Sequence, residues 1–217
     1  MNTKTNCVLL NRPLKKLAFV LSVLFHPLLV PSMVFCTLLY YHSFELVSIQ
    51  KETLLAWLVG STFLLPALLI LLLYSLNFIP SIQMNVKEER KIPMLLTIGV
   101  YAVTTCLLSH FIGKYHILTI AMFTIALSVV FVFMITCYWK ISAHATGIAG
   151  WLGVCLYLFI KNDFSHPYTF LLLLVLLINV LVLTSRKILH AHTYAQLAAG
   201  FLLGLSISFS AIQFLVK

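Results

Sequence analysis

Charged side chains, and acidic ones above all, are scarce in this chain of 217 residues. Only 9% of the residues are charged, whereas a soluble domain carries roughly 25%. At the same time 62% of the residues are hydrophobic, which excludes a soluble globular protein and indicates an integral membrane protein. The length suits a single membrane domain, residues 1–217.

The shortage of carboxylates also limits the chemistry. Five acidic residues stand against fourteen Lys and Arg, which gives a formal net charge of +9. Mg²⁺ and Ca²⁺ sites need several oxygen ligands, usually from Asp or Glu, and only Glu88 and Glu89 are adjacent. The sequence therefore predicts chemistry without a metal ion or other cofactor. In a membrane protein, the positive charge favours lipid head groups or phosphate, and not nucleic acid, as partner.

Cysteines at metal-site spacing are missing as well. The five cysteines are scattered along the chain without a C-x-x-C pair. Neither a zinc site nor a disulfide framework is indicated.

Long apolar runs dominate what is present, and a bilayer-spanning helix needs about 20 apolar residues. The runs cover residues 17–41, 53–75, 94–113, 117–138, 145–161, 168–184 and 193–215. The first run follows four basic residues, as a signal peptide does, but it is too long and lacks a small-residue cleavage site. It contains two prolines, and the fifth run is short. We therefore predict an all-α transmembrane bundle of six or seven helices.

Three basic clusters interrupt the apolar runs, at residues 87–91, 140–144 and 185–196. With seven helices they follow the second, fourth and sixth, so they lie on one side of the membrane. Ionisable groups at a membrane boundary are costly unless they are solvated or functional, and we predict one shared anion site. The positive-inside rule leaves the orientation open, because most cations on that side belong to this site.

The third cluster has a specific spacing. Ser185 and Arg186, then five residues, then His192 resemble the third signature, S-R-x5-H-x3-D, of the type 2 phosphatidic acid phosphatase (PAP2) superfamily. Residues 141–144 are similar to its second signature, P-S-G-H, with Ile for Pro and Ala for Gly. Residues 87–93 are similar in position and charge to the first, K-x6-R-P, with closer basic residues and Ile for its Arg.

The resemblance covers residues 85–205 and leaves the N-terminal helices, residues 1–75, outside it. It implies a metal-independent hydrolase that acts on a membrane lipid phosphate at the bilayer. His192 would attack phosphorus to form a phosphohistidine, and His144 would act as general acid and then as base. The phosphate would be bound by cationic and hydroxyl side chains, namely Arg186, Ser142, Lys87, Arg90 and Lys91.

One position departs from the family, because its Asp four residues after the nucleophilic His is Gln196 here. The amide oxygen can still accept a hydrogen bond from His192 and orient the ring, but it brings no negative charge. Three alternatives therefore stay open: a lipid-phosphate binding or transport protein without turnover, a lipid phosphotransferase, and a structural membrane protein with accidental motifs.

The sequence does not choose among phosphatidylglycerol phosphate, phosphatidic acid, undecaprenyl diphosphate and lipid A phosphates as substrates of a bacterial inner-membrane enzyme. It also leaves the oligomeric state open. We expect the remaining histidines, including His26 and His190, to be structural. The prolines Pro27, Pro31 and Pro66 are expected to kink helices.

Overall fold

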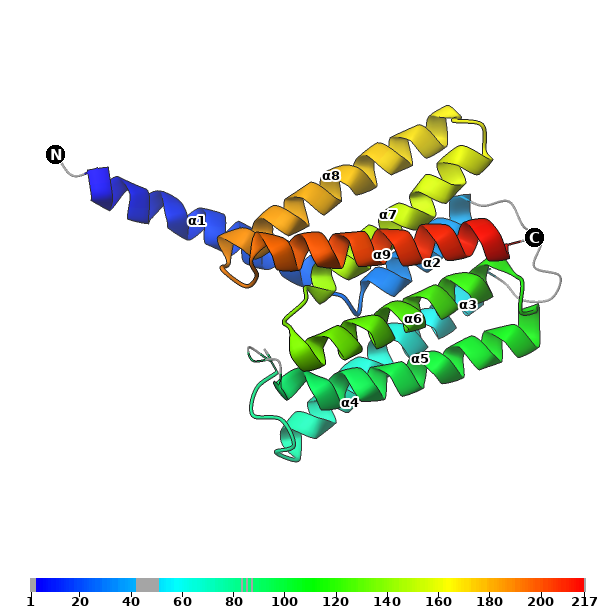
Figure 1. The fold of residues 1–217 in the computed structure, drawn as a ribbon, viewed down its shortest axis with the longest axis horizontal. Helices are drawn as coiled ribbons and strands as arrows, with labels where there is room; N and C mark the ends of the chain where they lie inside the picture. Colours follow the sequence, from blue (N-terminus) through cyan, green and yellow to red (C-terminus); the bar gives the residue numbers. More distant parts are fainter. Residues whose placement is uncertain (1–2, 42–50, 83, 85, 87, 217) are drawn as a thin grey trace.

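A computed structural model describes residues 3–41, 51–82, 84, 86 and 88–216, with side chains from residue 12 onward. These residues form helices and no strand, so the predicted all-α bundle is confirmed (Figure 1). The α-helices are α1 (Thr3–Leu24), α2 (Val30–Tyr41), α3 (Lys51–Val59), α4 (Leu65–Ser75), α5 (Lys91–Ile112), α6 (Ile117–Tyr138), α7 (Ala143–Lys161), α8 (His166–Ile188) and α9 (Tyr194–Leu215). A π-helical turn, Gly60–Leu64, joins α3 to α4, and a 3-10 turn, Glu88–Arg90, precedes α5.

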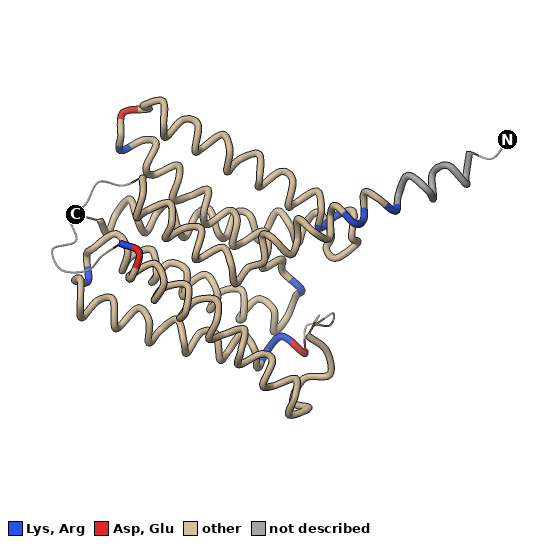
Figure 2. The backbone as a smooth tube through the Cα atoms, turned by 180° about the vertical axis from the view of Figure 1, so that it is seen from behind, with Lys and Arg blue, Asp and Glu red and all other residues tan. Residues whose placement is uncertain are grey.

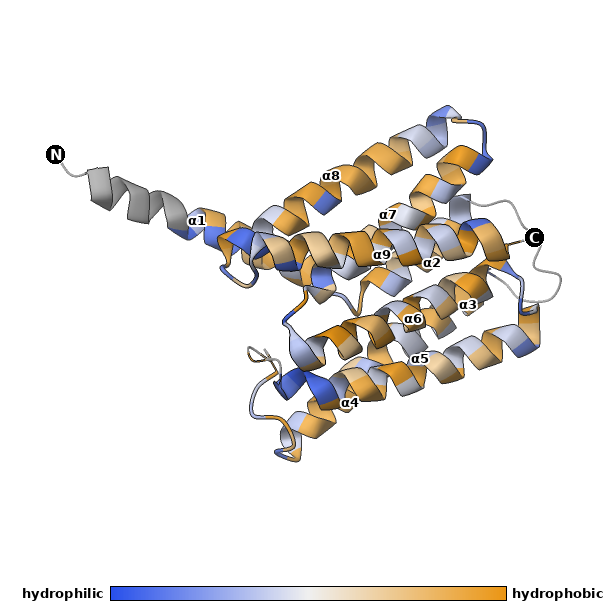
Figure 3. Ribbon diagram, viewed as in Figure 1, coloured by the Kyte–Doolittle hydropathy of each residue, from blue (hydrophilic) through white to orange (hydrophobic). Residues whose placement is uncertain are grey.

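Six of these units are long and apolar enough to cross a bilayer: Lys51–Ser75, Glu88–Ile112, Ile117–Tyr138, Ala143–Lys161, His166–Ile188 and Tyr194–Leu215. Most of their residues are hydrophobic (Figure 3). Large side chains such as Phe111 (70% exposed) and Phe170 (66% exposed) point away from the bundle. Exposure of this kind is expected where lipid and not water surrounds the protein.

The first apolar run, 17–41, whose two prolines left the predicted count at six or seven helices, is divided by a turn into α1 and α2. Pro27 has no N–H, and a residue that precedes proline is biased away from the helical conformation, as His26 is here. The amide of Leu29 closes the turn by donating to the carbonyl oxygen of His26 at 2.8 Å. Beyond this turn, α1 projects past the end of the bundle (Figure 1).

Pro66, also expected to kink a helix, lies in the first turn of α4, directly after the π-helical turn. Because Pro66 has no N–H, it cannot donate to the carbonyl oxygen of Thr62, four residues earlier. The hydroxyl of Tyr101 in α5 donates to that oxygen instead, at 2.8 Å. The bond ties α5 to the span that contains α3 and α4.

α7 lies at the centre of the bundle and packs against α2, α6, α8 and α9. Its contact with α9 depends on two glycines of that helix, Gly200 and Gly204, because small residues let two helix backbones approach closely. A Cβ atom on Gly204 would overlap the carbonyl oxygen of Thr146, and one on Gly200 would lie 2.7 Å from the carbonyl oxygen of Ser142. This close backbone contact sets the start of α7 against the start of α9.

The segments that carry the basic clusters gather at one end of the bundle, the end past which α1 projects (Figure 2). They are the turn before α5, the turn between α6 and α7, and the turn between α8 and α9. Clusters up to about a hundred residues apart in the chain are therefore neighbours in space.

Candidate active site

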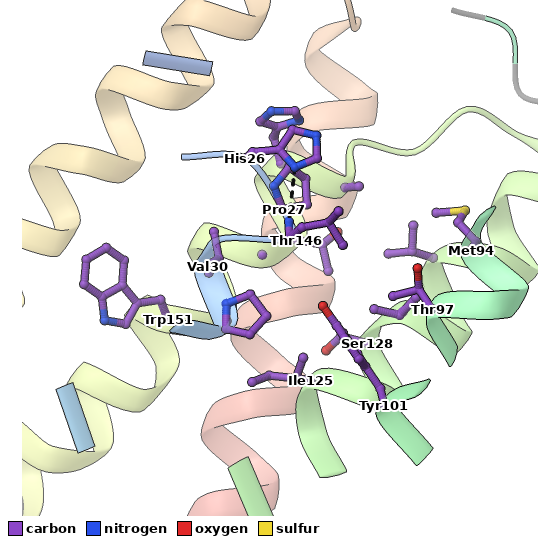
Figure 4. Close-up of a pocket in the computed structure, with 18 of the residues that line it drawn as sticks. His26, Pro27, Val30, Met94, Thr97, Tyr101, Ile125, Ser128, Thr146 and Trp151 are labelled. Carbon is purple, nitrogen blue, oxygen red and sulfur yellow. Dashed lines mark hydrogen bonds between the residues drawn. The ribbon is translucent and has the colours of Figure 1, made fainter. Parts of the chain in front are cut away.

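A cavity of about 240 Å³ lies between the helices, with a cationic end and an apolar interior. Figure 4 shows part of its lining, from His26 to Tyr101. Its arginine and histidine side chains come from the turn between α1 and α2 and from the three basic clusters. They are His26, Arg90, His144, Arg186 and His192. The fold thus brings one residue or more from each basic cluster to a single cavity.

His192 lies in the turn just before α9 and is buried, with 6% of its surface exposed. Its Nδ1 is 3.1 Å from Oε1 of Gln196, and that oxygen also accepts the backbone N–H of Thr193 at 3.1 Å. Because an amide oxygen can only accept, Nδ1 carries the ring proton. The lone pair is therefore on Nε2, the nitrogen left free to act as a nucleophile.

The surroundings of His192 keep its imidazole neutral. Burial lowers the pKa of His192 from 6.5 to about 4. The hydrogen bond to Gln196 opposes this shift, and nearby positive charges reinforce it, those of Arg186, Arg90 and Lys140. At neutral pH the ring is an uncharged base among cations, which is the form that can attack phosphorus.

His144 occupies the first turn of α7, and its ring nitrogens are also distinguished by their partners. Nε2 lies 3.0 Å from the carbonyl oxygen of Ser22 in α1. A carbonyl oxygen can only accept, so Nε2 donates to it and Nδ1 is the nitrogen that remains for proton exchange. The His144 ring is therefore oriented by a helix that the sequence motifs do not cover.

Arg186, in the last turn of α8, has a buried donor without an acceptor. Its Nε atom meets no hydrogen-bond partner in the described part of the chain. An unsatisfied buried donor costs about 1–3 kcal/mol. A guanidinium group presents a planar set of donors that fits phosphate, so an oxyanion in the cavity would satisfy it.

Two further cations surround the cavity. Arg90 is held by a hydrogen bond from its Nε to the carbonyl oxygen of Met84, at 2.9 Å. Burial lowers the pKa of Lys140, and the charges of Arg90 and Arg186 lower it further. Among the described residues, no three His, Cys, Asp or Glu side chains lie together as a metal site requires. The positive charge available to an anion there comes from these Arg and Lys residues.

Three of the predicted site residues lie away from the cavity wall. Ser142 is fully buried and caps α7, its Oγ accepting the N–H of Ala145 at 3.3 Å. Gln196 supports His192 from α9, and Lys91 begins α5 beside Arg90. Lys87 lies outside the described residues. The predicted residues that line the cavity are Arg90, His144, Arg186 and His192.

Sequence reasoning left out two groups near the cavity. His26, expected to be structural, lines it from the turn between α1 and α2, and Lys140 adds charge near His192. The signal for His26 was present in the sequence. A His-Pro pair within an apolar run marks an interrupted hydrophobic segment, and such interruptions often line binding sites in membrane proteins.

The interior of the cavity is an apolar chamber that continues from the cationic end. Its wall includes Val34, Ile70, Met94, Ile125, Val129, Val132, Trp151 and Val154. The threonine hydroxyls there donate to carbonyl oxygens of their own helices, at Thr97, Thr124 and Thr146. The chamber therefore presents mostly hydrocarbon.

The depth of the chamber follows from the helices that line it. Tyr101 and Val154 lie eleven residues beyond Arg90 and Ala143, which is roughly 16 Å at 1.5 Å per residue. That is about half of a bilayer's hydrocarbon core, which is roughly 30 Å thick. This depth suits an apolar occupant whose length is about that of one leaflet.

Comparison of the chain with models of protein families, with curated proteins and with solved structures finds no match.

Proposed function

We propose that this protein is a metal-independent phosphatase that hydrolyses a membrane lipid phosphate or diphosphate through a phosphohistidine intermediate. The observation that carries the proposal is a single cavity that joins two imidazoles and two guanidinium groups to an apolar chamber. A lipid phosphate has the same two parts, an anion and a hydrocarbon chain.

In the first step, Nε2 of His192 attacks phosphorus and the bond from phosphorus to the leaving oxygen breaks. Protonated His144 delivers the proton from Nδ1 to that oxygen, so the dephosphorylated lipid leaves uncharged from a monoester. Arg186 and Arg90 neutralise the phosphoryl oxygens as charge shifts onto the leaving group. The product is N-phosphorylated His192 with a neutral His144.

In the second step, water attacks the phosphohistidine while Nδ1 of His144 takes a proton from it. The bond between phosphorus and Nε2 of His192 breaks, inorganic phosphate leaves, and both histidines return to their starting states. Gln196 holds the His192 ring in one tautomer throughout, because its oxygen accepts the Nδ1 proton.

The substrate classes that fit a phosphate with an apolar chain are phosphatidylglycerol phosphate, phosphatidic acid, undecaprenyl diphosphate and lipid A phosphates. All of them occur in bacterial envelopes, and we propose the bacterial inner membrane as the location. The six apolar spans support a membrane location in general.

A second candidate is a protein that binds lipid phosphates without turnover. The observation that favours it is the partner of His192, a neutral amide where a carboxylate would stabilise positive charge on the ring. Loss of a carboxylate partner from a catalytic histidine can lower kcat by as much as about 10⁴-fold in serine proteases. In the proposed mechanism the histidine is the nucleophile, and the neighbouring arginines stabilise the negative charge of the phosphoryl group, not the positive charge of the ring.

The test is release of inorganic phosphate from a panel of lipid phosphates by the purified protein in detergent with excess EDTA. Wild type is compared with His192→Ala and with His190→Asn, a control that removes an exposed imidazole two residues away. His190 has a φ of 52°, a conformation that asparagine tolerates. Release that survives EDTA and the control but vanishes in His192→Ala supports a histidine phosphatase. Lipid binding without release by any variant would support the second candidate.

A further inference from the structure

The turn between α1 and α2 is an interruption inside an apolar segment. In a bilayer, irregular backbone is tolerated only where it is buried in protein or lines a cavity. This turn meets that condition, because His26, Pro27 and Leu28 all line the cavity that holds His144 and His192. The turn therefore forms part of the cavity wall, although it lies outside the part of the chain that carries the motifs.

The His26 ring is oriented by two contacts. It packs edge-to-face against the ring of His144, with centroids 5.6 Å apart and planes at 82°. Its Nδ1 accepts the backbone N–H of Leu28 at 3.3 Å. A nitrogen that accepts a hydrogen bond carries no proton, so the proton of the neutral ring is on Nε2. His26 thus offers the cavity an N–H donor.

The charge state of His26 follows from the same neighbours. Protonation of Nδ1 would set two N–H groups, its own and that of Leu28, against each other. Burial lowers the pKa of His26, and the positive charge of Arg186 lowers it further. His26 is therefore an uncharged hydrogen-bond donor, whereas His144 and His192 take part in the proposed reaction.

We infer that His26 is a third imidazole of the phosphate site and donates a hydrogen bond from Nε2 to an oxygen of the bound phosphate. The inference rests on the proposed phosphate site but not on turnover. An uncharged donor here adds to the binding of the phosphoryl oxygens without competing with His192 for the nucleophile's position. It also gives the interrupted helix a direct part in substrate recognition.

The decisive comparison is His26→Gln with His26→Met, because the two side chains have nearly the same shape and only Gln has an N–H donor. A third variant, His26→Phe, keeps an aromatic ring against His144 and removes the donor. The control is His166→Phe. His166 is an exposed histidine at the start of α8, far from Arg186 in its last turn. Each protein is purified in detergent, and its thermal unfolding is followed with increasing inorganic phosphate.

We expect phosphate to raise the Tm of wild type and of His166→Phe, to raise that of His26→Gln partly, and to have little effect on the Met and Phe variants. Where turnover is measurable, loss of the donor should lower kcat/KM by about 10²-fold, as for one oxyanion donor. Equal phosphate responses from Gln and Met would overturn the inference. So would a wild-type response from His26→Phe, which would mean that ring packing on His144 is the whole role.

The binding measurement separates this inference from the proposed activity. Suppose that wild type releases no phosphate but is stabilised by it, and that His26→Met loses this stabilisation. The result would support His26 as a hydrogen-bond donor to bound phosphate and would contradict the proposed hydrolase activity. If phosphate does not change the Tm of wild type, both the phosphate site and the role of His26 in it are contradicted.

Discussion

The Nδ1 atom of His192 and the Oε1 atom of Gln196, one helical turn apart, form a hydrogen bond of 3.1 Å. The same amide oxygen accepts the backbone N–H of Thr193, so it belongs to the capping box of α9 as well. One side chain thereby begins the helix and selects the tautomer of the candidate nucleophile. It does so without charge, which is one reason that the pKa of His192 can remain near 4.

Replacement of Gln196 by Glu should keep both hydrogen bonds and add a negative charge. The carboxylate stabilises protonated imidazole, so the pKa of His192 should rise from about 4 toward its ordinary value of about 6.5. In the proposed mechanism the neutral ring is the nucleophile, so protonation lowers activity and the acid limb of kcat/KM should move to higher pH.

The measurement is the pH profile of phosphate release for wild type, Gln196→Glu and Gln213→Glu. The last variant adds the same charge at an exposed position near the far end of α9 and should leave the profile unchanged. If the acid limb of Gln196→Glu coincides with that of wild type, His192 is not the group that sets it. Phosphate release in Gln196→Glu from a wild type that has none would favour the non-catalytic candidate.

Replacement of Arg186 by Met should stabilise the protein while abolishing phosphate release. The change removes a buried donor that has no acceptor among the described residues, which is worth about 1–3 kcal/mol. We expect a higher Tm in phosphate-free detergent and a loss of kcat/KM of at least about 10²-fold, because a phosphate-binding fork is lost.

The matched control for Arg186 is its neighbour Lys187, whose Nζ lies 4.0 Å from the ring centroid of Tyr194. Removing that contact in Lys187→Met should lower stability by about 0.5–1 kcal/mol and spare activity. Opposite signs of the two Tm shifts distinguish a binding arginine from a stabilising cation. A lower Tm in Arg186→Met would contradict the interpretation of Nε as an unsatisfied donor.

Filling the apolar chamber should discriminate between long and short substrates. Ser128 of α6 lines the chamber (Figure 4), and Ser128→Leu would displace a few methylenes of a bound chain, at about 0.8 kcal/mol each. We expect kcat/KM for a long-chain lipid phosphate to fall by about 10-fold or more, whereas hydrolysis of a water-soluble aryl phosphate should hardly change. The exposed position Ala102 in α5 provides the control, Ala102→Leu. Equal losses on both substrates would argue against a hydrocarbon in the chamber.

Gly204→Ala should destabilise the bundle through its central contact. The new Cβ would overlap the carbonyl oxygen of Thr146, so α7 and α9 would have to separate, and overpacking of this kind costs about 1–3 kcal/mol. Because those helices carry His144 and position His192, activity should fall with stability. Thermal unfolding is compared with that of Gly99→Ala, where nothing lies within 4 Å of the added Cβ. A Gly204→Ala protein as stable as wild type would show that the contact can relax.

Much of the fold is readable from local patterns in the chain. Apolar runs long enough for a bilayer predict the helices, and the spacing of Gly200 and Gly204 is typical of close helix packing. The structure identifies α7 as the partner. The exception is the run over 17–41, where Pro27 ends one helix. Hydropathy alone does not report such a break, because the turn and the helices on either side of it are equally apolar.

The sequence by itself determined the membrane class, the helices and the order of Arg90, His144, Arg186 and His192, because hydropathy and motif spacing are local properties of the chain. Only the tertiary structure decided which ring nitrogens are free. That depends on acceptors supplied by other segments, such as the carbonyl of Ser22 in α1. It also decided that His26 joins the cavity and that a hydrocarbon chamber lies behind the cations. A cavity is bounded by several helices at once, and no single stretch of sequence records its shape.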